Sequence, residues 1–122
     1  MYYVLHMTFG SYIKESRLER YETDRSYSVR QVAGRIGVEP AYLSKIERDV
    51  VPPPSEATIT SLAEQLELDP DVLLAMAGKV STDLQAVIRK RPALFAKVLR
   101  ELRDVPDGAV LEVVRLVRDG DW

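Results

Sequence analysis

Apolar side chains recur along most of the chain at the three- and four-residue spacing of amphipathic helices. Thr8 is a good N-cap for a helix over about 9–20, whose apolar residues are Phe9, Ile13 and Leu18. The polar stretch YETDRSY at 21–27 is typical of a loop. The first six residues show no polar periodicity, and among all segments only they leave room for a short strand.

The segment from Ser28 to Gly37 has the clearest helix boundaries in the chain. Ser28 supplies an oxygen acceptor at the N-cap, and Gln31, three residues later, can return a hydrogen bond, which makes a capping box. Gly37 supplies the left-handed residue that ends many helices. These signals predict a helix over about 29–36.

A third helix is predicted directly afterwards, over about 40–48. Pro40 takes its first position, where proline loses no hydrogen bond, and Leu43 and Ile46 form its apolar face. Ala33 provides a small side chain where this helix would cross the preceding one. Two short helices joined by a glycine turn have the helix-turn-helix geometry.

The rest of the pattern is helical as well. After the stiff connection VVPPP at 50–54, Ser55 caps a fourth helix and Asp69 caps a fifth, which ends at Gly78. Three more helices are predicted beyond it: one from Ser81 or Thr82 to the Arg91-Pro92 pair, one over about 92–105, and, after a break at 106–108, one bearing Val110, Val113, Val114 and Val117. We expect an all-α chain with a five-helix domain at 1–78 and a helical extension at 79–122.

Composition excludes several kinds of site. The length of 122 residues suits one compact domain with a small extra module. The absence of cysteine excludes disulfides and thiolate metal sites, and a single histidine, His6, excludes a multi-histidine metal cage. No glycine-rich phosphate loop is present in the sequence. We therefore expect no cofactor, no bound metal and no enzymatic activity.

The pattern also argues against a membrane. No apolar run approaches the ~18 residues that a membrane span needs. The start, MYYVLHMTFG, lacks the basic region and the cleavage site of a secretory signal. We expect a cytoplasmic protein with no membrane partner.

Three stretches of the sequence resemble the XRE group of bacterial and phage regulators, which is related to the lambdoid Cro and repressor proteins. They are FGSYIKESR at 9–17, SVRQVAGRIGVEPAYLSKIER at 28–48 and PPSEATITSLAEQLELDPDVLLAMAG at 53–78. The resemblance implies a five-helix, lambda-repressor-like DNA-binding domain, usually dimeric, that regulates or represses transcription. It also implies an ion pair between Arg17 and Glu47 that ties the first helix to the end of the third.

The third predicted helix carries the candidate base-reading side chains, because its polar face suits a major groove about 12 Å wide. Lys45 can donate to guanine O6 and N7, and Ala41 can touch a thymine methyl group. The amides at the start of the second helix, with Ser28 and Arg30, can contact phosphates. For every candidate, the alternative is an ordinary solvated helix surface. The candidate DNA-binding residues are Ser28, Arg30, Glu39, Pro40, Ala41, Tyr42, Ser44, Lys45 and Arg48.

Four features depart from the family pattern. The loop at 21–27 is longer than usual, and its Arg25 either helps to hold DNA or has no such role. Val29 stands where a polar donor is common, and Asp49 stands where glycine is common, although aspartate tolerates the left-handed region. The connection at 50–54, often basic, carries no cation here.

The formal net charge of −2 is unevenly distributed. Residues 9–50 sum to +1, residues 51–78 to −5 and residues 79–122 to +2. The negative balance therefore comes from the fourth and fifth helices, and the candidate DNA-reading half is nearly neutral.

We expect double-stranded DNA as the partner, bound by a homodimer. The apolar stripes at 81–119 must be covered, either by packing within the chain or by a second copy. The second interpretation is an antitoxin-like module in which these helices grip a different protein.

Overall fold

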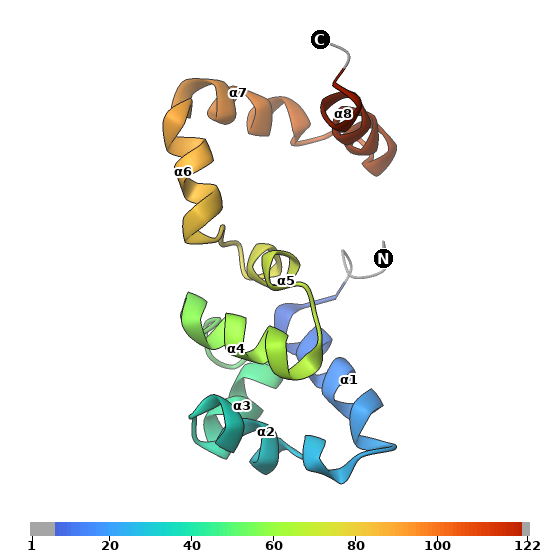
Figure 1. The fold of residues 1–122 in the computed structure, drawn as a ribbon, viewed down its shortest axis with the longest axis vertical. Coiled ribbons are helices and arrows are strands. Elements are labelled where there is room, and N and C mark those ends of the chain that lie inside the picture. Colours follow the sequence, from blue (N-terminus) through green and yellow to red (C-terminus); the bar gives the residue numbers. More distant parts are fainter. Residues whose placement is uncertain (1–6, 121–122) are drawn as a thin grey trace. The chain divides into compact units, whose positions relative to one another are not determined.

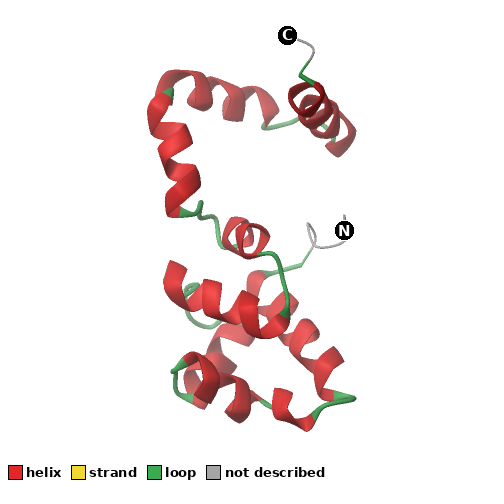
Figure 2. Cartoon of the chain, viewed as in Figure 1, coloured by secondary structure: helices red, strands yellow, loops and turns green. Residues whose placement is uncertain are grey.

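The computed structural model describes residues 7–120, and these form helices with no strand (Figures 1 and 2). The expected all-α fold is thus confirmed, whereas the interpretations of residues 1–6 and of His6 lie outside the described residues. The elements in chain order are α1 (Phe9–Tyr21), the 3₁₀ turn η2 (Arg25–Tyr27), α2 (Val29–Ile36), α3 (Pro40–Glu47), α4 (Glu56–Leu66), α5 (Pro70–Met76), α6 (Thr82–Lys90), α7 (Pro92–Leu102) and α8 (Asp107–Asp119).

The chain divides into two compact units, the first ending at Ser81 and the second beginning at Thr82. In the first unit, α1 packs against α3 and α4, α2 packs against α3 and α4, and α4 packs against α5. The apolar stripes of all five helices meet in one core, as an amphipathic pattern requires, but Leu18, expected on the apolar face of α1, lies outside it and is 40% exposed. Its buried side chains are Phe9, Ile13, Val32, Ala33, Leu43, Ile46, Ile59, Leu62, Ala63, Leu66, Leu73 and Leu74.

Four helices of this unit end in the same way, with a left-handed residue whose N–H and whose successor's N–H both bond back to the last turn. Gly37 and Gly78 end α2 and α5 with φ of 76° and 73°. Asp49 and Glu67 do the same after α3 and α4, with φ of 57° and 54°. A side chain at such a position costs about 1–3 kcal/mol, so these two residues carry strain that the glycines avoid.

The second unit consists of α6, α7 and α8, and none of its described residues is buried. The helix expected over 92–105 ends at Leu102, and Pro106 disfavours the helical region for Val105, so the helix does not extend that far. The expected break at 106–108 is instead the start of α8, where the carbonyl of Pro106 accepts from the amide of Ala109 at 3.0 Å.

Within residues 7–120, every helix is too short or too polar to cross a membrane.

Candidate nucleic-acid interface

The helices α2 and α3 form a helix-turn-helix inside the first unit. Ala33 is fully buried where α2 meets α3, and Gly37 makes the left-handed turn between them. Leu43 and Ile46 bury the inner face of α3 in the core. The outer face of α3 is therefore the only one it can offer to a ligand.

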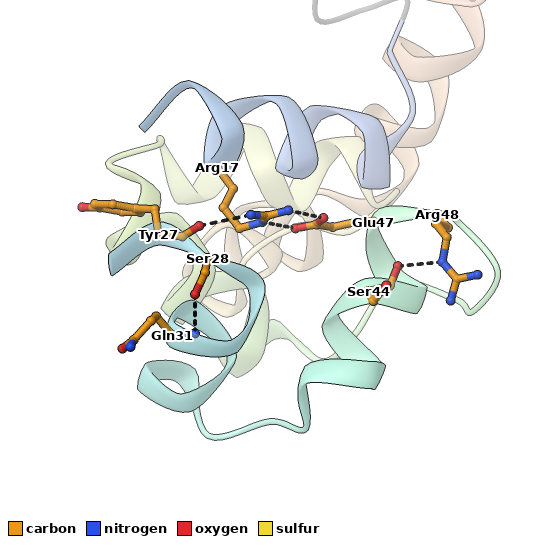
Figure 3. Close-up of polar contacts among 7 residues, drawn as sticks. All are labelled: Arg17, Tyr27, Ser28, Gln31, Ser44, Glu47 and Arg48. Carbon is orange, nitrogen blue, oxygen red and sulfur yellow. Dashed lines mark hydrogen bonds and ion pairs between the residues drawn. The ribbon is translucent and has the colours of Figure 1, made fainter. Parts of the chain in front are cut away.

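That outer face carries three of the candidate DNA-binding residues in one stripe. Ala41, Lys45 and Arg48 are exposed, whereas Tyr42 and Ser44 are half-buried at its borders. Tyr42 packs against the core, so its ring has a structural role whatever its hydroxyl contacts. The Arg48 guanidinium folds back along α3, where its Nε donates to the carbonyl of Ser44 at 3.3 Å (Figure 3).

Two residues precede the stripe at the start of α3. Glu39 is exposed and occupies the N-cap position, but its side chain makes no capping bond. Its carbonyl accepts from the amides of Tyr42 and Leu43, and Pro40 takes the first helical position. The Glu39 carboxylate thus remains available beside the stripe.

The start of α2 is capped by Ser28, whose Oγ accepts from the amide of Gln31 at 3.2 Å (Figure 3). The return bond from the Gln31 side chain does not form in the described structure, so the expected capping box is only half made. Arg30 is exposed. Val29, the departure from the family pattern, packs against the core, which gives the apolar residue a structural reason.

The ion pair expected between Arg17 and Glu47 forms, and both residues are 5% exposed. Arg17 Nε and Nη2 donate to the two carboxylate oxygens at 2.6 and 2.9 Å (Figure 3). Arg17 Nη1 also donates to the carbonyl of Tyr27 at 3.1 Å. One guanidinium therefore joins α1, the end of α3 and the segment that enters α2.

The long loop at 21–27 is more ordered than its polar sequence suggests, because it contains the turn η2. Asp24 caps that turn by accepting from the hydroxyl of Ser26 at 2.7 Å and from its amide at 2.9 Å. These two hydrogen bonds, the hydroxyl's first, lower the pKa of the Asp24 carboxyl. The guanidinium of Arg25 lies 4.4 Å from the centre of the Tyr21 ring.

Tyr27 closes the loop. The guanidinium groups of Arg20 and Arg35 lie 5.9 and 5.2 Å from the centre of the Tyr27 ring. Arg35 also donates to the carbonyl of Ser26 at 2.7 Å. The loop is thereby fixed where it joins α2.

Sequence reasoning missed one residue, Asp49, which it treated only as a departure from the family pattern. Its carboxylate accepts from the amide of Gly10 at 2.9 Å and from the hydroxyl of Thr8 at 2.6 Å. No local signal could have found these bonds, because the partners lie about forty positions away in the sequence.

The candidate site offers hydrogen-bond donors and cations rather than metal ligands. Across residues 7–120, no group of three or more His, Cys, Asp or Glu side chains could hold a metal ion. The cations of the stripe are Lys45 on α3 and Arg48 at its C-cap, and the connection at 50–54 adds none. Such a surface can contact base edges and phosphates.

Comparison with known protein families gives the same assignment. A family model described as a helix-turn-helix domain matches residues 9–76, more than half of the chain. Searches of curated proteins and of solved structures found no match. The matched range spans α1 to α5, including the helix-turn-helix itself, and agrees with the resemblance to XRE regulators. The chain therefore belongs to the helix-turn-helix domain family, a class of DNA-binding proteins.

Proposed function

We propose that this protein is a sequence-specific DNA-binding regulator, a repressor that acts as a homodimer with α3 in the major groove. The observation that carries the proposal is the division of α3 into a buried apolar face and an outer face bearing Ala41, Lys45 and Arg48. An α-helix with such an outer face fits the major groove, where each base pair presents its own pattern of donors and acceptors.

Each candidate side chain on the outer face of α3 or at its start has a suitable target on DNA. Lys45 donates to guanine O6 and N7, and the methyl group of Ala41 packs against a thymine methyl. The Glu39 carboxylate, at the start of the helix beside Pro40, accepts from a cytosine amino group. Ser44 and the hydroxyl of Tyr42 reach a base edge or a phosphate from the borders of the stripe.

Phosphate contacts come from two places. The start of α2, with its free first-turn amides, the half-buried Ser28 and the exposed Arg30, suits an anion. Arg48 reaches a phosphate once it leaves the Ser44 carbonyl, which costs little because this bond is long and exposed. With so few cations, we expect base contacts to supply much of the affinity.

The second unit is the proposed dimerisation element, continuing the assignment of residues 79–122. Ten large apolar side chains of α6, α7 and α8 and their connections are exposed, from Leu84 to Val117. A unit of about forty residues without disulfides or metal rarely holds a core of its own. Pairing with a second copy covers these side chains and brings two copies of α3 to half-sites one helical turn apart, about 34 Å. A dimer on its site in the cytoplasm would repress by excluding other proteins from that DNA.

Selection of bound sites from a random double-stranded DNA pool, with the purified full chain, tests this function. We expect two similar half-sites with centres about 10 base pairs, or a multiple of that, apart. Affinity for the selected site should fall steeply as salt rises. A pool that remains random after repeated selection would overturn the proposal.

A second candidate function rests on the same exposed side chains of the second unit. In an antitoxin-like module they would bind a different protein, with or without DNA. Sedimentation of the full chain purified from its native cells distinguishes the two. A dimer of one polypeptide supports the repressor, whereas a stoichiometric complex with a second polypeptide, dissociated by Val114→Asp but unaffected by Lys45→Ala, supports the alternative.

A further inference from the structure

The end of α3 contacts the start of α1 through Asp49, just beyond the helix. Asp49 Oδ1 accepts from the amide of Gly10, and Oδ2 accepts from the hydroxyl of Thr8. Thr8 is itself the N-cap of α1 and accepts from the amide of Ser11 at 3.0 Å. First-turn amides have no partner within their own helix, and the positive end of a helix attracts a carboxylate. Asp49 therefore acts as a second cap for α1, supplied by the end of α3.

The backbones meet closely at the same point. A Cβ atom on Gly10 would lie 2.3 Å from the carbonyl oxygen of Ile46 and 2.8 Å from that of Glu47. Only glycine allows this approach, so the last turn of α3 rests directly on the first turn of α1. The hydrogen bonds of the Asp49 carboxylate to Thr8 and Gly10 add to this backbone contact.

Asp49 and Glu67 occupy equivalent backbone positions, with φ of 57° and 54°, yet their side chains differ in use. The Glu67 side chain is 76% exposed and pairs with Arg20 at 3.4 Å. The Asp49 side chain makes two hydrogen bonds to another helix. Both residues therefore carry the same backbone strain, but only the Asp49 side chain hydrogen-bonds to the start of another helix. Glu67 is thus a natural control for Asp49.

The end of α3 is held to α1 at two places. Glu47 binds Arg17, and Asp49 binds Gly10, seven residues earlier on α1, a separation of about 10 Å along the helix axis. Leu43 and Ile46 hold α3 in the core, and two contacts at its end restrict its tilt against α1 more than one contact would. We propose that Asp49 is a positioning residue for DNA reading, which fixes the angle at which α3 presents its outer face; this inference rests on the proposed DNA-binding function.

The distances make the angle matter. Ala41 lies eight residues from Asp49, about 12 Å along α3, so a tilt of about 10° moves the start of the helix by about 2 Å. Hydrogen bonds to base edges tolerate only a few tenths of an ångström, so such a tilt breaks them. Contacts to phosphates through flexible cations would survive it. Loss of the Asp49 contact should therefore lower specificity more than general affinity.

The test compares three variants of the full chain. Asp49→Gly removes the side chain and relieves the backbone strain. Asp49→Asn keeps an acceptor for the Gly10 amide, remains able to bond Thr8 and removes the same charge. Glu67→Gly is the matched control at the other left-handed position. Residual dipolar couplings measure the angle between α1 and α3, and binding assays compare the selected site with random DNA.

For Asp49→Gly we expect a changed or broadened α1–α3 angle and a loss of about tenfold in the ratio of specific to random affinity, equivalent to one lost base contact. Asp49→Asn and Glu67→Gly should keep both the angle and the ratio. An unchanged ratio in folded Asp49→Gly, or an equal loss in Asp49→Asn, would overturn the inference.

The same design separates this inference from the proposed function. If the wild-type chain selects no DNA sequence, the proposed function fails, and the dipolar couplings alone then judge the positioning role. An unchanged helix angle in Asp49→Gly would overturn it, and a changed angle would support it. Should Asp49→Gly unfold at the assay temperature, Thr8→Val replaces it, with Ser55→Ala at the cap of α4 as the control for a lost cap.

Discussion

The two units of the chain have similar patterns of apolar residues, but they differ in whether these apolar side chains are buried. Both consist of short helices with apolar stripes, separated by short connections. In the first unit, five helices bury twelve apolar residues in one core, whereas the second unit buries none among its described residues. An apolar stripe therefore predicts that a helix must be covered, but it does not say what covers it.

The largest contrast should come from leucine truncation. Leu62→Ala empties a fully buried position and should destabilise the first unit by about 2–5 kcal/mol. Leu99→Ala, on a side chain that is 63% exposed, should change the stability of an isolated chain by less than about 0.5 kcal/mol. Urea unfolding at low protein concentration measures both. Equal losses would show that the second unit has a core of its own and would remove the contrast.

Ion pairs should sharpen the same comparison. Glu47→Gln leaves a buried guanidinium without its counter-charge and should cost about 3 kcal/mol. The matched change Glu112→Gln breaks an exposed pair with Arg115 on α8 and should cost under about 0.5 kcal/mol. Denaturant midpoints at two salt concentrations check this. A Glu47→Gln loss that vanishes at high salt would contradict a buried pair.

Lysine substitutions in the two units should have different effects on DNA affinity. Lys45→Ala should weaken binding to the selected site about tenfold and leave random DNA nearly unchanged, because it removes a base contact. Lys97→Ala, an exposed lysine on α7, should not alter this selectivity. Arg30→Ala should weaken all sequences alike and flatten the salt slope by about one unit. Equal losses on all DNA for Lys45→Ala would rule out a base-reading role.

Glycine replacements give a smaller effect. A Cβ on Gly34 in α2 or on Gly108 in α8 meets nothing within 4 Å. Gly34→Ala should raise the stability of the first unit by about 0.5–1 kcal/mol. Gly108→Ala should leave the thermal unfolding transition of the first unit unchanged, since we expect the two units to unfold separately. Calorimetry checks this, and a shift of the main transition in both variants would show that the units unfold together.

The smallest effect concerns acid. The hydrogen bonds from Ser26 hold the pKa of Asp24 below its ordinary value, so the folded state binds this proton less readily than the unfolded chain. The resulting stabilisation is present above the ordinary carboxyl pKa and is lost as pH falls through the lowered one. Asp24→Asn should slightly flatten the acid limb of stability in the first unit. An acid limb identical to that of the wild type would contradict this.

The sequence predicts local structure well because its signals are local. Ser28, Gly37 and Pro40 each act on their own turn, and the helices begin and end where these residues require. The half-burial of Tyr42 and the bonds of Asp49 escape prediction, because both depend on helices distant in the sequence. The Arg17–Glu47 pair came from the family resemblance and not from the spacing.

The anchoring of Tyr27 bears on how this loop could lengthen during evolution. The Tyr27 carbonyl accepts from Arg17, and the Tyr27 ring lies near Arg20 and Arg35, so the chain enters α2 from a fixed point. Extra residues placed between Tyr21 and Asp24 would then lie outside that anchor. The loop can therefore accept insertions and new surface chemistry while the helix-turn-helix beside it keeps its geometry.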